Sequence, residues 1–294
     1  MIAARVRKTA RIILCVAAAG MVAFYLRRMP FAEIMRSLRS AQPLPLVFAA
    51  LVYLGPNTAA KVRRWASLLA ALPRRGKGLG TFELARVLFA SQAASNLLPA
   101  RAGEAVRIVE LHRRGYGTTG LVAAQLYEKV VEAASLCLLG GIAAVLAGIA
   151  IFHVPAWMPA VAGSALVLLL FGATRLARPL HFARSAAWAH SFLWSCAADL
   201  ADAAVLGLCL HAVGADLAPG AWLVVLLAIN VAILVPSTPG HVGVMEAAAL
   251  AALLALGVPA ERALAGAVLY HAIQIVPGTA VGLLSLPRLR RSLA

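Results

Sequence analysis

Acidic side chains are scarce in this sequence. Of its 294 residues, 11 are Asp or Glu and 27 are Lys or Arg, and only 13% are charged in total. Hydrophobic residues make up 62% of the chain. Because so little polar surface cannot cover a water-soluble globule of this length, the composition excludes a soluble domain and predicts a polytopic membrane protein.

The sequence also lacks the motifs of common catalytic and metal sites. It has no His-Glu zinc motif, no Gly-x-Ser-x-Gly turn, no phosphate-binding Gly-rich loop and no Cys/His cluster. Its four cysteines lie apart inside apolar runs, without paired or metal-like spacing, and are expected to be small packing residues. We therefore expect no catalytic residue, no metal and no cofactor, and we expect the protein not to be an enzyme.

The formal net charge is +16, and its basic residues lie mainly between and beside the apolar runs. In a soluble protein such a charge would suggest nucleic acid. In a membrane protein the same distribution is typical of topology signals and of contacts with anionic lipid head groups. Membrane lipids are therefore the expected partners, and nucleic acid is not.

Eight apolar runs predict the helices. They cover residues 12–26, 44–60, 81–98, 119–150, 158–174, 190–212, 219–235 and 261–286. A helix needs about 20 mainly apolar residues to cross a bilayer, and the shorter pieces 100–112 and 241–256 follow proline-containing breaks. The sequence predicts an all-α integral membrane protein, a single domain over 1–294, with about six full transmembrane helices and two broken or re-entrant hairpins, 81–112 and 219–256.

Basic loops predict the orientation, because cytoplasmic loops carry the excess of Lys and Arg. The amino terminus, 61–78, 175–184 and the tail are basic, whereas 152–159 and 214–220 contain no Lys or Arg. Both termini are therefore expected in the cytoplasm, and residues 1–150 and 151–294 are expected to form an inverted-topology repeat. The basic stretch 27–42 then falls outside, where "FAEIMRSLRSA" could form an amphipathic helix on the membrane interface.

The two breaks share a pattern. "NLLPARAGEAVR" runs from Asn96 to Arg107, "NVAILVPSTPGHVGVMEAA" runs from Asn230 to Ala248, and each contains Asn, Pro, Gly and Glu in that order. Unpaired backbone at membrane depth is tolerated only in a protein interior or a wet cavity. Two facing helix amino termini could bind phosphate, with Arg101 and Arg107 as bidentate donors. Alternatively, the prolines and glycines merely kink close-packed helices.

Charged residues also lie inside apolar runs, where they are costly unless paired or hydrated. "QLYEKVVEA" contains Glu128, Lys129 and Glu132, which either mark a site or lie near the cytoplasmic interface. Asp199 and Asp202 share one helix face in "SCAADLADAA". This pair is a possible proton-coupling site or the partner of Arg101 or Arg107.

Three further polar residues lie near the second break. His241, inside the break, is a candidate for proton handling. His271 and Gln274 are three residues apart on one later helix. For these two residues we expect an interhelical hydrogen bond rather than a functional role.

At these residues the chain resembles the lysylphosphatidylglycerol synthase transmembrane region, a flippase-like membrane family. The resemblance rests on "SNLLPARAGEAVR", "YEKVVE" and "VPSTPGHVGVMEAA". Lys129 stands where the family usually has Arg, Glu132 where it has Asp, and His241 where a second Gly is common. The substrate-binding residues that the resemblance implies are Asn96, Pro99, Arg101, Gly103, Glu104, Arg107, Glu128, Lys129, Pro236, Pro239, Gly240, Gly243 and Glu246.

The resemblance implies a lipid flippase of a bacterial cytoplasmic membrane. Its substrate would be an anionic or phosphate-bearing lipid of a phospholipid, glycolipid, polyprenyl or hopanoid pathway. The last apolar run is followed only by "LPRLRRSLA", so we expect the stand-alone form without an aminoacyl-transferase domain. Two alternatives stay open: an accessory protein that holds a lipid for a biosynthetic enzyme partner, and a membrane enzyme that acts on lipid phosphate.

Overall fold

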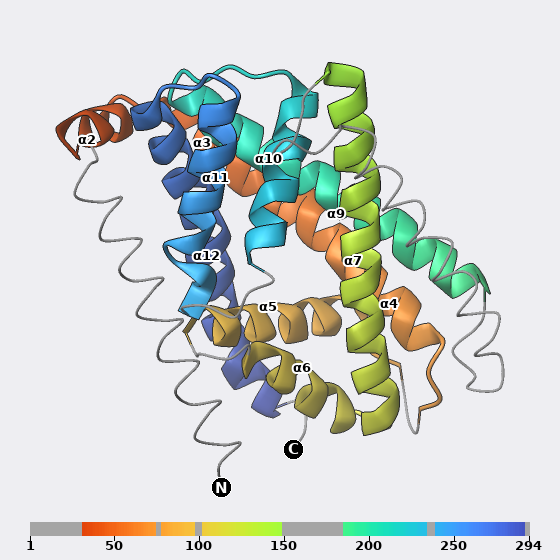
Figure 1. The fold of residues 1–294 in the computed structure, drawn as a ribbon. Helices are drawn as coiled ribbons and strands as arrows, with labels where there is room; N and C mark the ends of the chain where they lie inside the picture. The colour runs from red at the N-terminus through yellow and green to blue at the C-terminus, as the bar shows by residue number, and fades with distance from the viewer. Residues whose placement is uncertain (1–30, 75–77, 98–101, 149–184, 234–238, 292–294) are drawn as a thin grey trace, which may run out of the picture.

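The computed structural model describes residues 31–74, 78–97, 102–148, 185–233 and 239–291. Within these ranges the chain forms helices joined by turns, and the one β-type pairing is an isolated bridge between Arg74 and Tyr116. Figure 1 shows the helices packed into one bundle. The predicted all-α fold is confirmed.

Four helical segments of the described residues are long and apolar enough to cross a membrane. They are Pro43–Ala70, Thr118–Ala147, Ala189–Ala212 and Ala260–Ser285. The first consists of α3 (Pro43–Val52), a π-helical turn (Tyr53–Asn57) and α4 (Thr58–Ala70); the others belong to α7 (Thr118–Ala147), α9 (Ser185–Ala212) and α12 (Ala260–Arg291). They match four of the six predicted spans, and the predicted spans 12–26 and 158–174 lie outside the described residues.

The π-helical turn has a local cause in Pro56. Proline has no N–H to donate and its ring clashes with the preceding turn, and a wider turn relieves such a conflict. The Thr58 hydroxyl donates to the Tyr53 carbonyl at 2.9 Å, so a backbone acceptor in this turn is satisfied by a side chain. Because the helix continues through the turn to Ala70, the predicted end at residue 60 is wrong.

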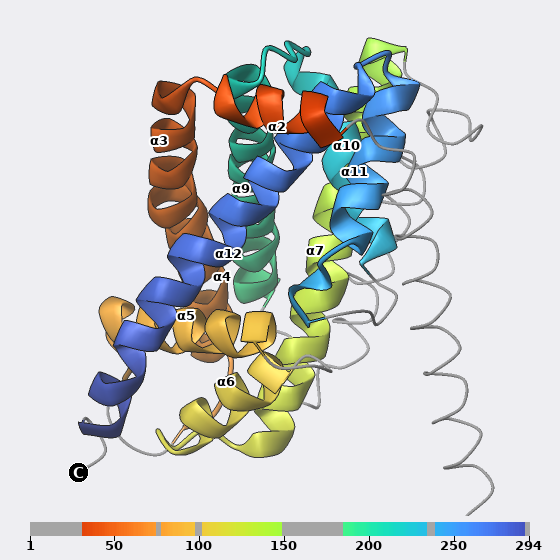
Figure 2. The same cartoon turned by 90° about the vertical axis from the view of Figure 1, so that its left-hand side faces the viewer.

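The two predicted hairpins are present as packed helix pairs. The first consists of α5 (Thr81–Leu97) and α6 (Ala102–His112). The second consists of α10 (Pro219–Ala232), a 3-10 turn (Pro239–His241) and α11 (Val244–Ala255). Figures 1 and 2 show the first pair beside the carboxyl end of α12 and the second pair toward the opposite end of the bundle. The inverted repeat of 1–150 and 151–294 stays a prediction.

Helix α9 lies at the centre of the bundle, in contact with α3, α4, α7, α10 and α12. Its residues Leu206 and Leu210 are fully buried. Large apolar side chains also lie exposed on the outside of the spans, among them Leu126, Leu146 and Leu284. An outward-facing apolar surface of this kind suits a hydrocarbon surrounding rather than water.

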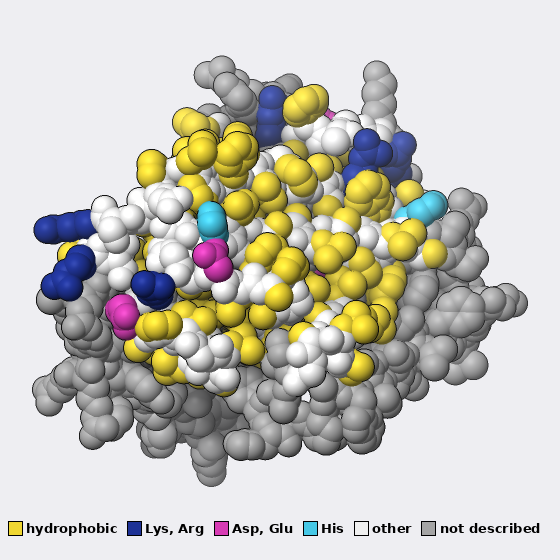
Figure 3. All heavy atoms as spheres, turned by 90° about the horizontal axis from the view of Figure 1, so that it is seen from above, with side chains coloured by type: hydrophobic (Ala, Val, Ile, Leu, Met, Phe, Trp, Pro, Cys, Tyr) yellow, Lys and Arg dark blue, Asp and Glu magenta, His cyan; other side chains and the backbone are white. Residues whose placement is uncertain are grey.

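Helix α2 (Phe31–Arg39) lies at the end of the bundle where α9 turns into α10. The Gln42 N–H, just after α2, donates to the Ala212 carbonyl at 2.8 Å. The predicted short helix in 27–42 is therefore confirmed, and its side of the membrane stays a prediction. Viewed from this end, the described surface is mainly hydrophobic, with Lys and Arg at a few places toward its rim (Figure 3).

Candidate functional site

A polar cavity of about 300 Å³ lies where the two hairpins meet. The first hairpin lines it with Gln92, Ser95, Asn96 and Glu104, and the second with Asn230, Gly240, His241 and Met245. The spans contribute further charged residues to its wall: Lys61, Arg64, Lys129, Glu132, Asp199 and Asp202. The cavity therefore collects polar residues from both breaks and from the predicted charged runs.

The two breaks touch each other at this cavity. Gly240 has a φ of 64°, a left-handed conformation that glycine adopts at little cost. A Cβ atom at this glycine would lie 3.5 Å from the Asn96 carbonyl oxygen of the first hairpin. The Asn96 side chain in turn donates to the Thr279 hydroxyl on α12 at 2.9 Å. Both interrupted helices are thus joined at one place, against α12.

The first hairpin depends on close backbone packing at Gly103. The Ser91 hydroxyl on α5 donates to the Gly103 carbonyl on α6 at 2.7 Å. A Cβ atom at this position would lie 1.9 Å from the Ser91 carbonyl oxygen, far inside any allowed contact. Gly103 therefore acts as the point of closest approach between the two helices, and Glu104 follows it on the cavity wall.

The second hairpin is held by a chain of polar bonds instead. The Glu246 carboxylate accepts from the Gly243 N–H at 2.7 Å and caps α11. Its other oxygen lies 2.6 Å from His271 Nδ1, while His271 Nε2 lies 2.8 Å from the Gly240 carbonyl. The imidazole therefore links α12 both to the cap of α11 and to the backbone of the second break. The predicted interhelical bond of His271 is confirmed.

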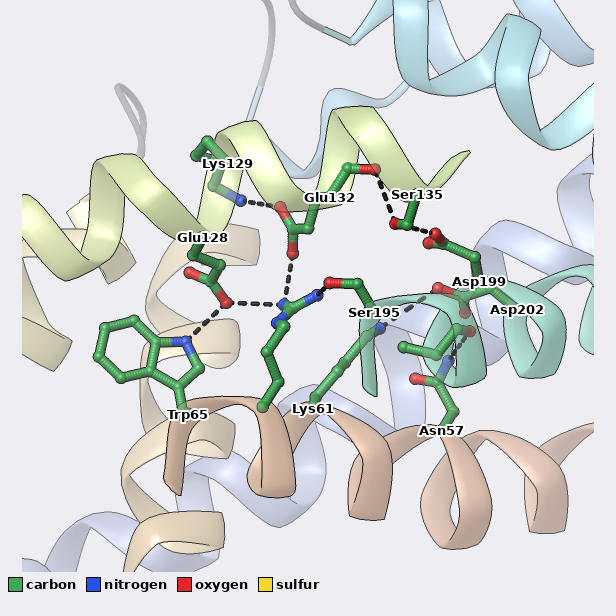
Figure 4. Close-up of polar contacts among 12 residues, drawn as sticks. Asn57, Lys61, Trp65, Glu128, Lys129, Glu132, Ser135, Ser195, Asp199 and Asp202 are labelled. Carbon is green, nitrogen blue, oxygen red and sulfur yellow. Dashed lines mark hydrogen bonds and ion pairs between the residues drawn. The ribbon is translucent and has the colours of Figure 1, made fainter. Parts of the chain in front are cut away.

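Arg64 is the centre of a buried ion-pair cluster, whose other members Trp65, Glu128, Glu132 and Ser195 are labelled in Figure 4. Its guanidinium donates to Glu128 at 2.6 Å, to Glu132, and to the Ser195 hydroxyl at 3.1 Å. The Trp65 indole N–H also donates to Glu128 at 2.6 Å. These bonds join α4 to α7 and α9, and the Arg64 side chain is only 3% exposed.

Arg107 extends the same cluster to the first hairpin. Its guanidinium lies 3.2 Å from Glu128 and stacks over the Trp65 ring, 4.4 Å from the ring centroid. Neither Arg107 nor Glu128 contributes to the described cavity wall. The structure thus places Arg107 in an ion pair behind the cavity rather than at the position expected for a phosphate contact.

The predicted Asp199 and Asp202 pair does line the cavity, and each carboxylate has its own partner. Asp199 accepts from the Ser135 hydroxyl of α7, and Asp202 lies 3.4 Å from Lys61 Nζ. Of the two arginines considered as possible partners of this pair, Arg107 is bonded to Glu128 instead, and Arg101 lies outside the described residues. Lys61 is the basic partner of Asp202.

The placement of Lys61 and Arg64 in a cytoplasmic loop was wrong. Both residues lie in α4 and line the cavity, because the helix runs on past Pro56 and turns them toward carboxylates on α7 and α9. Asn57 belongs to the same face and donates to the Ala198 carbonyl at 3.1 Å. The spacing of Asn57, Lys61 and Arg64, four and then three residues apart, is a helical polar stripe and was the available signal.

Three predicted site residues, Pro99, Arg101 and Pro236, lie outside the described residues. Pro239 begins the 3-10 turn of the second break, and Gly243 precedes α11 with a φ of 89°. Among the residues that the structure describes, no group of three or more His, Cys, Asp or Glu side chains is arranged to bind a metal ion.

Four spans, two interrupted hairpins and a charged cavity between them define a multi-pass membrane protein of the broken-helix type. The family model described as "Lysylphosphatidylglycerol synthase TM region" matches residues 11–282. The chain therefore belongs to this family, as the sequence motifs indicated. A search of curated proteins gave no match.

Proposed function

We propose that this protein moves an anionic or phosphate-bearing lipid across the cytoplasmic membrane of a bacterium. The observation that carries the proposal is the polar cavity between the two hairpins, inside a bundle whose outer surface is apolar. Membership of a family named for the membrane region of a lipid synthase supports a lipid-related role.

The size and the lining of the cavity suit a lipid head group. About 300 Å³ is at the lower end of the range of small-molecule sites, roughly 300 to 1,000 Å³. A head group would occupy this volume, while the acyl chains would remain along the apolar outside of the spans. This division keeps the polar part of the lipid out of hydrocarbon during its passage.

The arrangement of the hairpins supports alternating access as the mechanism. They lie toward opposite ends of the bundle, and their breaks meet at the cavity. Rocking of one repeat against the other around such a site would open it to one leaflet and then to the other. In this proposal both termini face the cytoplasm and Asp199, Asp202 and His241 serve as coupling residues.

Reconstitution into proteoliposomes tests the proposal. Fluorescent phosphatidylglycerol and other head-group variants are followed between leaflets by a quencher added outside. Faster exchange of at least one lipid than in protein-free liposomes is the expected result, and an unchanged rate for the whole panel contradicts it. Stable co-purification with a lipid-modifying enzyme, without exchange, would instead favour the accessory role.

A further inference from the structure

We infer that Arg64 and Lys129 form the phosphate-binding subsite of the cavity, and that Glu132 occupies this subsite until a phosphate-bearing head group displaces it. The inference rests on the proposed function, since it assigns the atoms that would bind the head group of the lipid. It gives Glu132 the role of an internal substitute for the substrate.

The contacts of Glu132 resemble those of a bound oxyanion. One carboxylate oxygen accepts from the Arg64 guanidinium, and the other lies 2.8 Å from Lys129 Nζ. Figure 4 shows the Glu132 carboxylate directed toward Lys129, and all three residues line the cavity. A guanidinium and an ammonium that hold separate oxygens of one anion can hold two oxygens of a phosphate in the same way.

Glu132 and its neighbour Glu128 differ in how exposed their side chains are. The Glu128 side chain is 2% exposed and is bonded to Trp65 and Arg107 as well as Arg64. The Glu132 side chain is 30% exposed. If Glu132 turns away, Arg64 is still paired with Glu128, so the move does not leave a buried guanidinium without a counter-charge. Glu128 is thus the fixed partner of Arg64, and Glu132 is the exchangeable one.

The charge of the cluster favours an incoming anion. Once Glu132 has turned away, Arg64, Arg107 and Lys129 supply three positive charges against the one negative charge of Glu128. Asp202 is paired with Lys61, and Asp199 is bonded to the neutral Ser135 hydroxyl, so with Asp199 ionised a surplus of one positive charge is left. A phosphodiester brings one negative charge and would neutralise the surplus, which an uncharged head group would not.

The test is equilibrium binding of dioctanoyl-phosphatidylglycerol to the purified full chain in an uncharged detergent, with dioctanoylglycerol as the head-group-free reference. Glu132→Gln removes the internal competitor and is expected to bind the phosphatidylglycerol roughly tenfold more tightly. Glu110→Gln is the matched control, because Glu110 is also held by two cations, Arg113 at 3.1 Å and Arg114 at 3.0 Å, but lies outside the cavity wall. Its affinity should stay that of the wild type.

Equal affinities of the Glu132→Gln and Glu110→Gln proteins would overturn the inference, and so would equal tightening for dioctanoylglycerol. If Glu132→Gln does not yield folded protein, Lys129→Gln replaces it: the Lys129 side chain is 43% exposed, and its loss should weaken phosphatidylglycerol binding several-fold. Unchanged binding of that variant overturns the inference.

The binding and exchange assays together distinguish the inference from the proposed function. Lipid exchange by the wild type without tighter binding by Glu132→Gln refutes only the inference. Tighter binding by Glu132→Gln without any lipid exchange by the wild type refutes only the proposed function.

Discussion

The two hairpins meet at one cavity, but they are held together by different interactions. The first is held by backbone contact, since Ser91 and the backbone of Gly103 touch directly. The second is held by side chains, through Glu246 and His271. The same order of Asn, Pro, Gly and Glu therefore does not give equivalent positions the same role: Glu104 lines the cavity, whereas Glu246 caps its helix.

Among substitutions in the two hairpins, Gly103→Ala should cause the largest loss of stability. The added methyl group would overlap the Ser91 carbonyl oxygen and force α5 and α6 apart, which should cost about 3 kcal/mol or more. Thermal unfolding of the purified protein in detergent measures this loss. Gly55→Ala is the control, because a Cβ atom there meets nothing within 4 Å. Equal melting temperatures for the two variants would show that the first hairpin is not held by backbone packing.

A smaller loss of stability should distinguish substitution of Glu246 from substitution of Glu104. Glu246→Ala removes the cap of α11 and leaves His271 with only the Gly240 carbonyl, at an expected cost of about 2 kcal/mol. Glu104→Ala should cost less than this, because the close packing at Gly103 already positions α6. Both variants are unfolded under the same conditions, and a less stable Glu104 variant would contradict the different roles of the two glutamates.

The smallest effect concerns the bond between the first break and α12. Thr279→Val keeps the shape of the side chain but removes the acceptor of the Asn96 amide. Interhelical hydrogen bonds in membranes contribute about 0.6 kcal/mol on average, so a loss of about that size is expected. Denaturation in mixed detergent measures it, and a cost above that of Glu246→Ala would reverse the ranking.

Local patterns predicted the framework of the fold. Apolar length gave four spans that the structure confirms, and the prolines and glycines of the two breaks gave both hairpins. The sequence indicated that charged residues inside apolar runs could mark a site, and Lys129, Asp199 and Asp202 line the cavity. These features depend on the length of apolar runs and on the residues that interrupt them, and both can be read from a short stretch of the sequence.

The ion-pair cluster depends instead on contacts between distant parts of the chain. Arg64 looks like a loop residue after an apolar run, and its pairing with Glu128, Glu132 and Ser195 makes its burial tolerable. In the same way, Arg107 looks free to bind phosphate until Glu128 is found beside it. The polar stripe of Asn57, Lys61 and Arg64 could have indicated a helix face, but no local pattern states which carboxylate an arginine will meet, so the partners of Arg64 and Arg107 could not be predicted.

Leaflet exchange measured after the cavity has been filled shows whether a lipid head group passes through it. Gln274 lines the cavity on α12, and Gln274→Trp should obstruct the passage of a head group. Val276 lies on the same helix and is 64% exposed, so Val276→Trp adds the same side chain outside the cavity. If head groups pass through the cavity, Gln274→Trp lowers exchange to the rate of protein-free liposomes, while Val276→Trp keeps the wild-type rate. Equal exchange by both variants would contradict passage through the cavity.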